Sequence, residues 1–247
     1  SIFHAISAFN NAGFTLFSDG FANSATVFNY PFQLTIIVLI VLGGLGFMVL
    51  YDLFIMSKDA FGRKKIHLHL QSKIAISSSV VLIILGVLVY YLSENGNNLV
   101  SSKQSIWMQA LFQSVTSRTA GFNTVDFSLL GNGFILFTLL LMFVGASSGS
   151  TGGGVKTSTL AVSFLSILKK RERDNNYGNS FLSNELVNKA KKIILYSLSV
   201  ILVSVIILLI TERDHTFLDL LFEEISAFAT VGLSRGITSH LSDIGKT

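Results

Sequence analysis

Three short segments of the chain end in the same pattern: a short polar residue, an apolar residue and a glycine. The three tips are Asn11-Ala12-Gly13, Thr119-Ala120-Gly121 and Thr230-Val231-Gly232. They recur with a period of about 110 residues, and an internal repeat determines the architecture before any other signal does. No tip holds an acidic residue, so main-chain carbonyl oxygens are the candidate ligands. Such oxygens favour a weakly hydrated monovalent cation over a divalent one.

An apolar stretch that is too short to cross a membrane precedes each tip. Trp107–Ser117 and Phe217–Ala229 are predicted to form half-length helices, with Ser105 and Thr216 as N-caps. A short helix that enters from outside points its C-terminal carbonyls at the membrane centre, where their partial negative charge favours a cation. For one tip, a glycine that merely caps a helix would be the better interpretation. Three tips that recur at a nearly constant spacing favour a filter of carbonyl oxygens.

The composition is that of a membrane protein. Of 247 residues, 50% are hydrophobic and 13% are charged, against about 25% charged in a soluble domain. Four segments lack Asp, Glu, Lys and Arg and reach the roughly 20 apolar residues that a spanning helix needs. They are Phe21–Tyr51 with an apolar core at Thr35–Leu50, Ile74–Ser93, Phe127–Val155 and Ile193–Thr211. A buried helix of a large soluble protein is the alternative, which four such segments disfavour.

Most of the 18 basic residues lie in two connections between these segments. The first connection holds Lys58, Arg63, Lys64, Lys65 and Lys73, and the second holds Lys169, Lys170, Arg171, Arg173, Lys189, Lys191 and Lys192. By the positive-inside rule both connections are cytoplasmic, and the half-length helices therefore enter from outside. A nucleic-acid site is the weaker interpretation, because these charges lie directly at membrane ends.

The third apolar segment is interrupted by glycine. Gly145–Gly154 is almost all Gly, Ser and Thr, and because glycine is a poor helix former we expect a broken helix that faces a cavity below the filter. Close helix packing through Gly145, Gly149 and Gly153 and a phosphate-binding loop are weaker alternatives. Lys156 lies roughly 20 Å up a helix from Lys169, so it would either oppose cation passage or anchor the loop.

Smaller signals leave alternatives open. Gly43-Gly44-Leu45-Gly46 within the first span indicates tight helix packing, or else a hinge. Arg118 would brace the filter through carbonyls or reach the outer water, and Arg235 is expected at the outer mouth. His67 and His69 are expected to be exposed and not metal-bound, since no acidic residue or cysteine accompanies them at ligand spacing.

Taken together, the three tips and the segment from Ser148 to Thr157 resemble the Trk/Ktr/HKT superfamily of potassium transporters, and within it the bacterial Ktr membrane subunit. Thr230-Val231-Gly232 also matches the start of the potassium-channel filter, although Leu233 replaces the usual Tyr. The resemblance implies potassium uptake through a filter lined by Asn11, Ala12, Gly13, Thr119, Ala120, Gly121, Thr230, Val231 and Gly232. It implies a gating loop made of Gly145, Ala146, Ser147, Ser148, Gly149, Ser150, Thr151, Gly152, Gly153, Gly154 and Lys156.

The same resemblance sets the expected assembly. It implies a four-repeat monomer in the cell membrane, usually a homodimer, with a cytosolic nucleotide-binding regulatory ring as partner. Potassium is the expected substrate, sodium is open as a coupling or activating ion, and the chain itself is expected to hold no cofactor and to bind no nucleic acid.

The expected fold is an all-α integral membrane protein whose span–pore-loop–span units, similar to those of potassium channels, surround a pseudo-fourfold pore. We expect a pore loop and span in residues 1–56, a complete repeat with its preceding cytoplasmic loop in 57–168, and a cytoplasmic loop, span and pore loop in 169–247. Because the chain begins inside a half-length helix, we expect a fragment of a longer protein with a further repeat.

Two other classes of function are alternatives. A solute carrier with discontinuous helices usually has inverted repeats, whereas these units run parallel. A membrane ATPase is the third class, but the chain offers no nucleophile–base set, so no enzyme is expected. Cysteine is absent, which excludes disulfides and thiolate metal sites.

Overall fold

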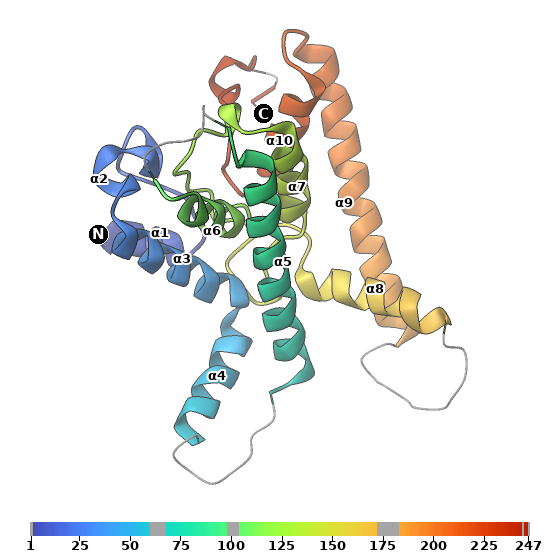
Figure 1. Cartoon of the computed structure of the whole chain (residues 1–247). Coiled ribbons are helices and arrows are strands. Elements are labelled where there is room, and N and C mark those ends of the chain that lie inside the picture. The colour runs from blue at the N-terminus through green and yellow to red at the C-terminus, as the bar shows by residue number, and fades with distance from the viewer. Residues whose placement is uncertain (1, 60–67, 98–103, 172–182, 244, 247) are drawn as a thin grey trace.

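The computed structural model describes residues 2–59, 68–97, 104–171, 183–243 and 245–246. The basic residues Arg63, Lys64, Lys65 and Arg173, and His67, lie outside these ranges. Within them the regular structure is helical, with one isolated β-bridge between Val144 and Val155. Two described helices are long and apolar enough to cross a membrane, α5 (Leu70–Glu94) and α9 (Asn184–Thr211), which confirms the second and fourth predicted spans (Figure 1).

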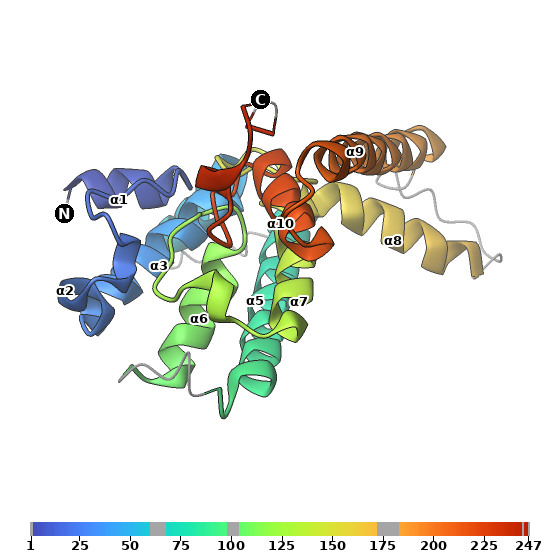
Figure 2. The ribbon, with the colours of Figure 1, turned by 90° about the horizontal axis from the view of Figure 1, so that it is seen from above.

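The half-length helices are present in all three repeats. They are α1 (Ile2–Phe9), α6 (Ile106–Thr116) and α10 (Phe217–Phe228). Viewed from above, α1 lies beside α3 (Tyr30–Leu45), α6 beside α5, and α10 beside α9 and α7 (Figure 2).

The two predicted N-caps differ. The Thr216 hydroxyl accepts a hydrogen bond from the backbone N–H of Asp219, as predicted. Ser105 occupies the N-cap position of α6, but its side chain makes no capping bond.

The first predicted span is not one straight helix, and this corrects the prediction for Phe21–Tyr51. The chain bends by 106° between α3 and α4 (Phe47–Asp59), at Gly46. Gly46 has a φ of 88°, where other residues are strained, and a Cβ there would lie 2.7 Å from the carbonyl oxygen of Ser148. The break therefore makes room for the glycine-rich segment of another repeat.

The third span is broken, as predicted. Helix α7 (Asn132–Phe143) ends before the glycine-rich segment, and α8 (Thr157–Arg171) begins after it. Short elements complete the described chain at η1 (Gly20–Ala22), α2 (Ser24–Val27), η2 (Phe127–Leu129) and η4 (Thr238–His240). The divisions expected after residues 56 and 168 remain predictions.

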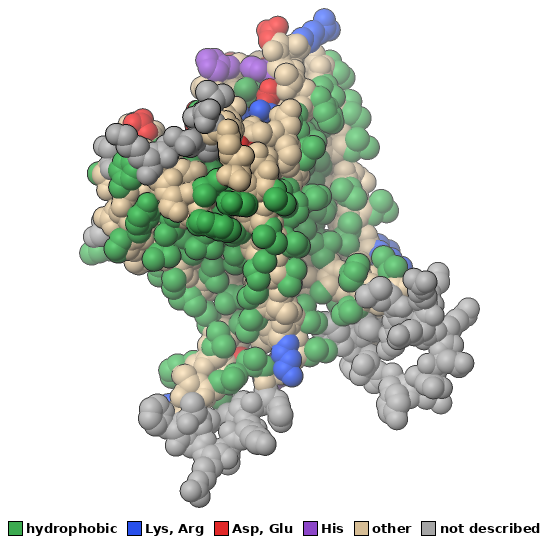
Figure 3. Space-filling model, in the orientation of Figure 1, with side chains coloured by type: hydrophobic (Ala, Val, Ile, Leu, Met, Phe, Trp, Pro, Cys, Tyr) green, Lys and Arg blue, Asp and Glu red, His purple; other side chains and the backbone are tan. Residues whose placement is uncertain are grey.

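The ends of the helices agree with the predicted orientation. The last residues of α4 and α8 and the first residues of α5 and α9 lie toward the lower side of Figure 1, while α5 and α9 both end at the upper side. The described helix ends that flank the two basic connections therefore lie on one side. Apolar side chains cover the middle of the visible surface, and charged ones lie toward its ends (Figure 3). This band of apolar surface is suited to lipid.

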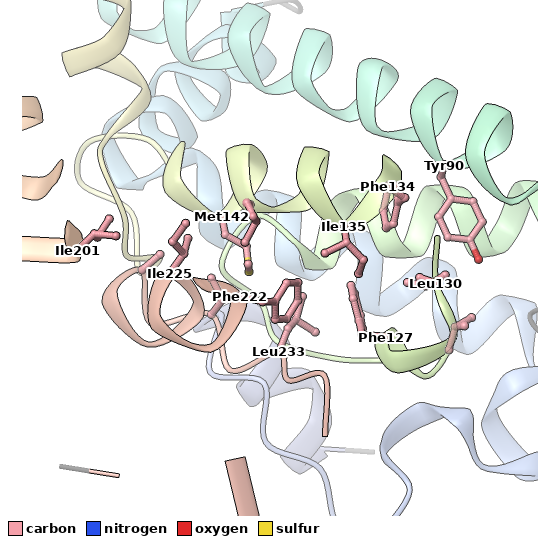
Figure 4. Packing of buried hydrophobic residues seen from close by; sticks show 14 of the residues in the cluster. Tyr90, Phe127, Leu130, Phe134, Ile135, Met142, Ile201, Phe222, Ile225 and Leu233 are labelled. Carbon is pink, nitrogen blue, oxygen red and sulfur yellow. The ribbon is translucent and has the colours of Figure 1, made fainter. Parts of the chain in front are cut away.

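The buried core fixes the half-length helices to the longer ones. One cluster joins α10 to α7 and α9, with Phe222 and Ile225 of α10 near Met142 of α7 (Figure 4). A second cluster joins α1, α3 and α6 through Ala8, Ile40 and Phe112, among others. Between membrane helices such contacts stabilise through van der Waals packing and not through removal of apolar surface from water, and this packing holds the half-length helices against their neighbours.

Candidate functional site

The three glycine tips meet at one place. A Cβ added at Gly13 would lie 2.6 Å from the carbonyl oxygen of Ala120 and 3.1 Å from the Cα of Gly121. A Cβ added at Gly121 would overlap the carbonyl oxygen of Val231. Only glycine therefore allows the tips to approach so closely. A Cβ at Gly232 would meet no atom within 4 Å, so this tip borders open space.

The tips also share one backbone conformation. Among the described residues, the non-glycine residues with a positive φ are Asn11 (50°), Thr119 (72°) and Thr230 (53°). Each lies two residues before the tip glycine, whose φ is also positive: 72° at Gly13, 82° at Gly121 and 85° at Gly232. A left-handed non-glycine residue is uncommon and marks a functional constraint. The identical strain in three repeats indicates that the tips do the same job.

Each half-length helix ends in a backbone hydrogen bond that spans five residues, typical of a Schellman cap. The bonds run from Ala12 N to Ser7 O (2.9 Å), from Gly121 N to Thr116 O (3.4 Å) and from Val231 N to Ser226 O (2.8 Å). The caps turn the chain out of the helix and into the tip at the deep end of each helix.

A hydroxyl near the end of each half-length helix holds the residue that follows the tip glycine. The donors and carbonyl acceptors are Ser7 to Phe14 (2.9 Å), Thr116 to Phe122 (2.5 Å) and Ser226 to Leu233 (2.6 Å). We did not predict these bonds. The signal was present, because the three hydroxyls occupy one column when the repeats are aligned.

The glycine-rich segment lies directly against the three tips. The Asn11 side-chain amide donates to the Thr151 hydroxyl at 3.1 Å. A Cβ at Gly152 would overlap the Thr119 hydroxyl, and a Cβ at Gly153 would overlap the Thr230 hydroxyl. Three consecutive residues of this segment thus contact one left-handed residue from each tip.

The segment folds back on itself instead of continuing as a helix. Gly145 N donates to Val155 O at 3.1 Å, and Ala146 N donates to Gly153 O at 3.3 Å. Gly145 and Ala146 are buried, and a buried backbone N–H needs a partner of this kind. The alternative of helix packing through glycines spaced four apart is wrong, because Gly149 has a φ of 76° and lies outside any helix.

Two basic side chains contact carbonyls of this segment. Lys156 Nζ donates to Gly152 O, which favours the anchoring role over free exposure to passing cations. Arg118 is 9% exposed and its Nη2 lies 3.5 Å from Gly145 O. Of the two alternatives for Arg118, the contact with a carbonyl is present and the exposure to outer water is not.

The remaining small signals have clear positions. A Cβ at Gly43 would overlap Phe9 O, which confirms tight packing there, while Gly46 forms the bend. Arg235 pairs with Asp219 at 2.6 Å on α10. His69 is exposed as predicted, but its Nδ1 lies 2.9 Å from Asp52. No group of three or more His, Asp or Glu among the described residues could hold a metal ion.

Comparison with known proteins gives one consistent result. The family described as "TrkH: Cation transport protein" matches residues 1–247. "Ktr system potassium uptake protein B" of Vibrio alginolyticus is 38% identical and that of Bacillus subtilis is 36% identical, each over 100% of this chain and 54% of the relative. "Potassium/sodium uptake protein NtpJ" of Enterococcus hirae is 35% identical over the same shares. The chain thus spans about half the length of the curated relatives it matches.

A solved structure shares the fold. The crystal structure of the potassium transporter TrkH from Vibrio parahaemolyticus matches with a TM-score of 0.71, at 21% identity, over 94% of this chain and 48% of that one. At this identity the likeness establishes the fold alone. It confirms the all-α membrane fold with pore loops that the sequence predicts.

Proposed function

Because the chain belongs to the TrkH family of cation transport proteins, we propose that it forms three quarters of a potassium-selective pore in an intact uptake protein. The observation that carries the proposal is the meeting of Gly13, Gly121 and Val231 from three repeats. The deep ends of α1, α6 and α10 point their negative dipole ends toward the same region, which stabilises a cation there. The earlier alternative of a solute carrier finds no support in the relatives.

The filter consists of the nine tip residues. In each repeat the left-handed residue and the glycine reverse the chain direction, and main-chain oxygens between them can replace the water around the ion. The residues are Asn11, Ala12, Gly13, Thr119, Ala120, Gly121, Thr230, Val231 and Gly232. Potassium is the substrate, and the names of the relatives support that choice.

The segment from Gly145 to Gly154, with Lys156, acts as a gate below the filter. Its contacts with Asn11, Thr119 and Thr230 support a closed position, because an ion leaving the filter would meet this segment first. Opening requires these contacts to break.

The intact protein works as a homodimer with a cytosolic nucleotide-binding ring. The word "system" in the names of the Ktr relatives supports a further subunit. Sodium takes part as a coupling or activating ion, which the name of the Enterococcus hirae relative supports. Potassium uptake measured with and without sodium tests the role of sodium. Co-purification of the intact protein with a second copy and with a cytosolic subunit tests the assembly.

Substitution of Gly121 by Ser in the intact protein tests the filter. A Cβ there would overlap Val231 O and would sit at a φ of 82°, so the ring of oxygens must open. We expect the preference for potassium over sodium to fall about tenfold or more, equivalent to about 1.4 kcal/mol. If the variant reaches the membrane in normal amount and its relative uptake of the two ions is unchanged, the assignment of the tips as the filter is wrong.

A further inference from the structure

One polar side chain in each half-length helix lies behind the filter and is not part of it. These residues are His4 in α1, Gln113 in α6 and Glu223 in α10. Each directly follows a phenylalanine and lies three positions before the hydroxyl residue that binds the carbonyl after the tip glycine, which is Ser7, Thr116 or Ser226. Residues at this spacing share one face of a helix. The helix face whose hydroxyl binds the carbonyl after the tip glycine therefore carries a second polar side chain, one helical turn nearer the start of the helix.

Each of these side chains binds the residue three positions after its own tip glycine. His4 Nε2 accepts from the backbone N–H of Leu16 at 3.2 Å. Gln113 Nε2 donates to the Thr124 hydroxyl at 3.1 Å. Glu223 Oε1 accepts from the backbone N–H of Arg235 at 2.9 Å. Three chemically different residues thus bind the corresponding position in three repeats, two by accepting from its backbone N–H and one by donating to its side-chain hydroxyl.

The strength of the connection differs between repeats. Glu223 accepts two more hydrogen bonds, from the Ser234 hydroxyl at 2.7 Å and the Thr238 hydroxyl at 2.6 Å. Hydrogen bonds to a carboxylate are roughly twice as strong as those between neutral groups. Gln113 is fully buried and its Oε1 has no partner among the described residues. The third repeat is therefore held most firmly.

The environment of His4 keeps its acceptor in place. The ring is 4% exposed, stacks on Phe17 with 5.3 Å between centroids, and meets Phe21 edge-on at 5.3 Å. Since Nε2 accepts from a backbone N–H, the ring proton belongs on Nδ1. An apolar ring of similar size could fill the same space but could not accept that bond.

We propose that His4, Gln113 and Glu223 are positioning residues that set ion selectivity from behind the filter. They do so by fixing the return segment of each repeat, which is the stretch of chain that directly follows the tip glycine. The inference rests on the proposed function, because selectivity requires the tips to be the filter. Each tip is thereby held at two points beyond its glycine. The first is the carbonyl of the next residue. The second is the residue two positions later, held through its backbone N–H in the first and third repeats and through the Thr124 hydroxyl in the second. A filter held at both points cannot shrink around the smaller sodium ion.

The test uses the intact protein in cells that lack other potassium uptake, with rubidium as the potassium probe. The measured quantity is the ratio of rubidium to sodium uptake, which compares two ions on the same molecules and does not depend on protein amount. The variants His4→Phe, Gln113→Met and Glu223→Met keep the size and remove the polar group. We expect the ratio to fall about twofold to tenfold for the first two and about tenfold or more for Glu223→Met.

Conservative variants separate positioning from folding. His4→Gln supplies an oxygen for the Leu16 N–H and should restore most of the ratio, while Glu223→Gln should lie between the wild type and Glu223→Met. Ser114→Ala is the matched control, because its hydroxyl, next to Gln113 on the same helix, binds Ile83 O of α5 and not a return segment. Should an apolar variant fail to reach the membrane, the Gln variants still give the ratio.

The outcomes divide cleanly. Wild-type ratios in the Phe and Met variants, or a loss in Ser114→Ala as large as in Gln113→Met, overturn the proposal. If the Phe and Met variants have wild-type ratios while Gly121→Ser has a low ratio, only the positioning role is overturned, and the assignment of the filter is retained. A wild-type ratio in Gly121→Ser removes the filter itself.

Discussion

The side-chain amide of Asn11 lies 3.1 Å from the hydroxyl of Thr151, although 140 residues separate them in the chain. Asn11 begins the first tip, and Thr151 belongs to the glycine-rich segment of the next repeat. The same segment meets the other two tips through Gly152 and Gly153. The filter and the segment below it therefore pack against each other, and a change in either should alter ion uptake.

Removal of Ser147–Gly152 from the intact protein should raise potassium uptake. The deletion takes away Thr151 and Gly152, which contact two of the tips, and leaves α7 and α8 joined by a shorter connection. The maximum rate of uptake in potassium-depleted cells measures the effect. A correctly inserted deletion variant with unchanged rate would show that this segment is not the barrier.

Lys156→Met should also raise uptake, by less than the deletion. The substitution keeps an unbranched chain of similar length but removes the hydrogen bond to Gly152 O. Hydrogen bonds to a charged group contribute about 1.5–3 kcal/mol, so the closed position loses about that much. Lys156→Arg is the control, since it keeps a charged donor. Reduced uptake in Lys156→Met would contradict the anchoring role.

Thr116→Val should weaken selectivity without loss of packing. Valine has the shape of threonine but cannot donate to Phe122 O, which the hydroxyl now binds at 2.5 Å. With about 0.5–1.5 kcal/mol for one such bond, the ratio of rubidium to sodium uptake should fall about twofold to tenfold. Thr116→Ser keeps the donor and should keep the ratio. Equal ratios in the valine and serine variants would show that the hydrogen bond from the Thr116 hydroxyl to Phe122 O does not contribute to selectivity.

Gly43→Ala should destabilise the contact between α1 and α3. Its Cβ would overlap Phe9 O, and overpacking of this kind costs about 1–3 kcal/mol. Gly44→Ala is an ideal comparison, because a Cβ there has its nearest neighbours at 3.7 and 3.9 Å. Thermal unfolding of the two purified variants in detergent measures the difference. Equal midpoints would mean that the helices do not pack as described.

Ser242→Ala should lower stability in a manner that depends on pH. Glu212 follows the outer end of α9, and the Ser242 hydroxyl is the main reason that the pKa of Glu212 lies below its usual value of 4.5. A lowered carboxyl pKa adds stability that is fully present above the unfolded pKa and is lost as the pH falls through the folded pKa. The gap in unfolding midpoint between wild type and variant should therefore be present at pH 7 and close in acid. A gap that stays constant or widens in acid would contradict this.

The sequence predicts the helical spans and the broken third helix well, because both depend on local composition. Two of the four long charge-free segments form α5 and α9, and Gly145–Gly154 cannot sustain a helix. The bend at Gly46 was expected only as the weaker alternative of a hinge, for the opposite reason. An apolar segment predicts a straight span, while the bend depends on Ser148 and Gly149, about 100 residues away, against which the chain must fold.

For the candidate site, the sequence predicts which residues form the tips but not how the tips are held. Asn11, Thr119 and Thr230 were chosen as short polar side chains, and the structure adds their left-handed backbone. The hydrogen bonds from Ser7, Thr116 and Ser226, and those of His4, Gln113 and Glu223, follow the repeat alignment but required coordinates to find. Such bonds join residues within one repeat through a turn whose geometry local propensity does not specify.

The most direct test of the account is the location of rubidium ions by anomalous scattering in a structure of the intact protein. The account predicts ordered rubidium among the main-chain oxygens of the tips at Gly13, Gly121 and Gly232. Rubidium bound elsewhere along the molecule, with these tips empty or turned toward lipid, would contradict it.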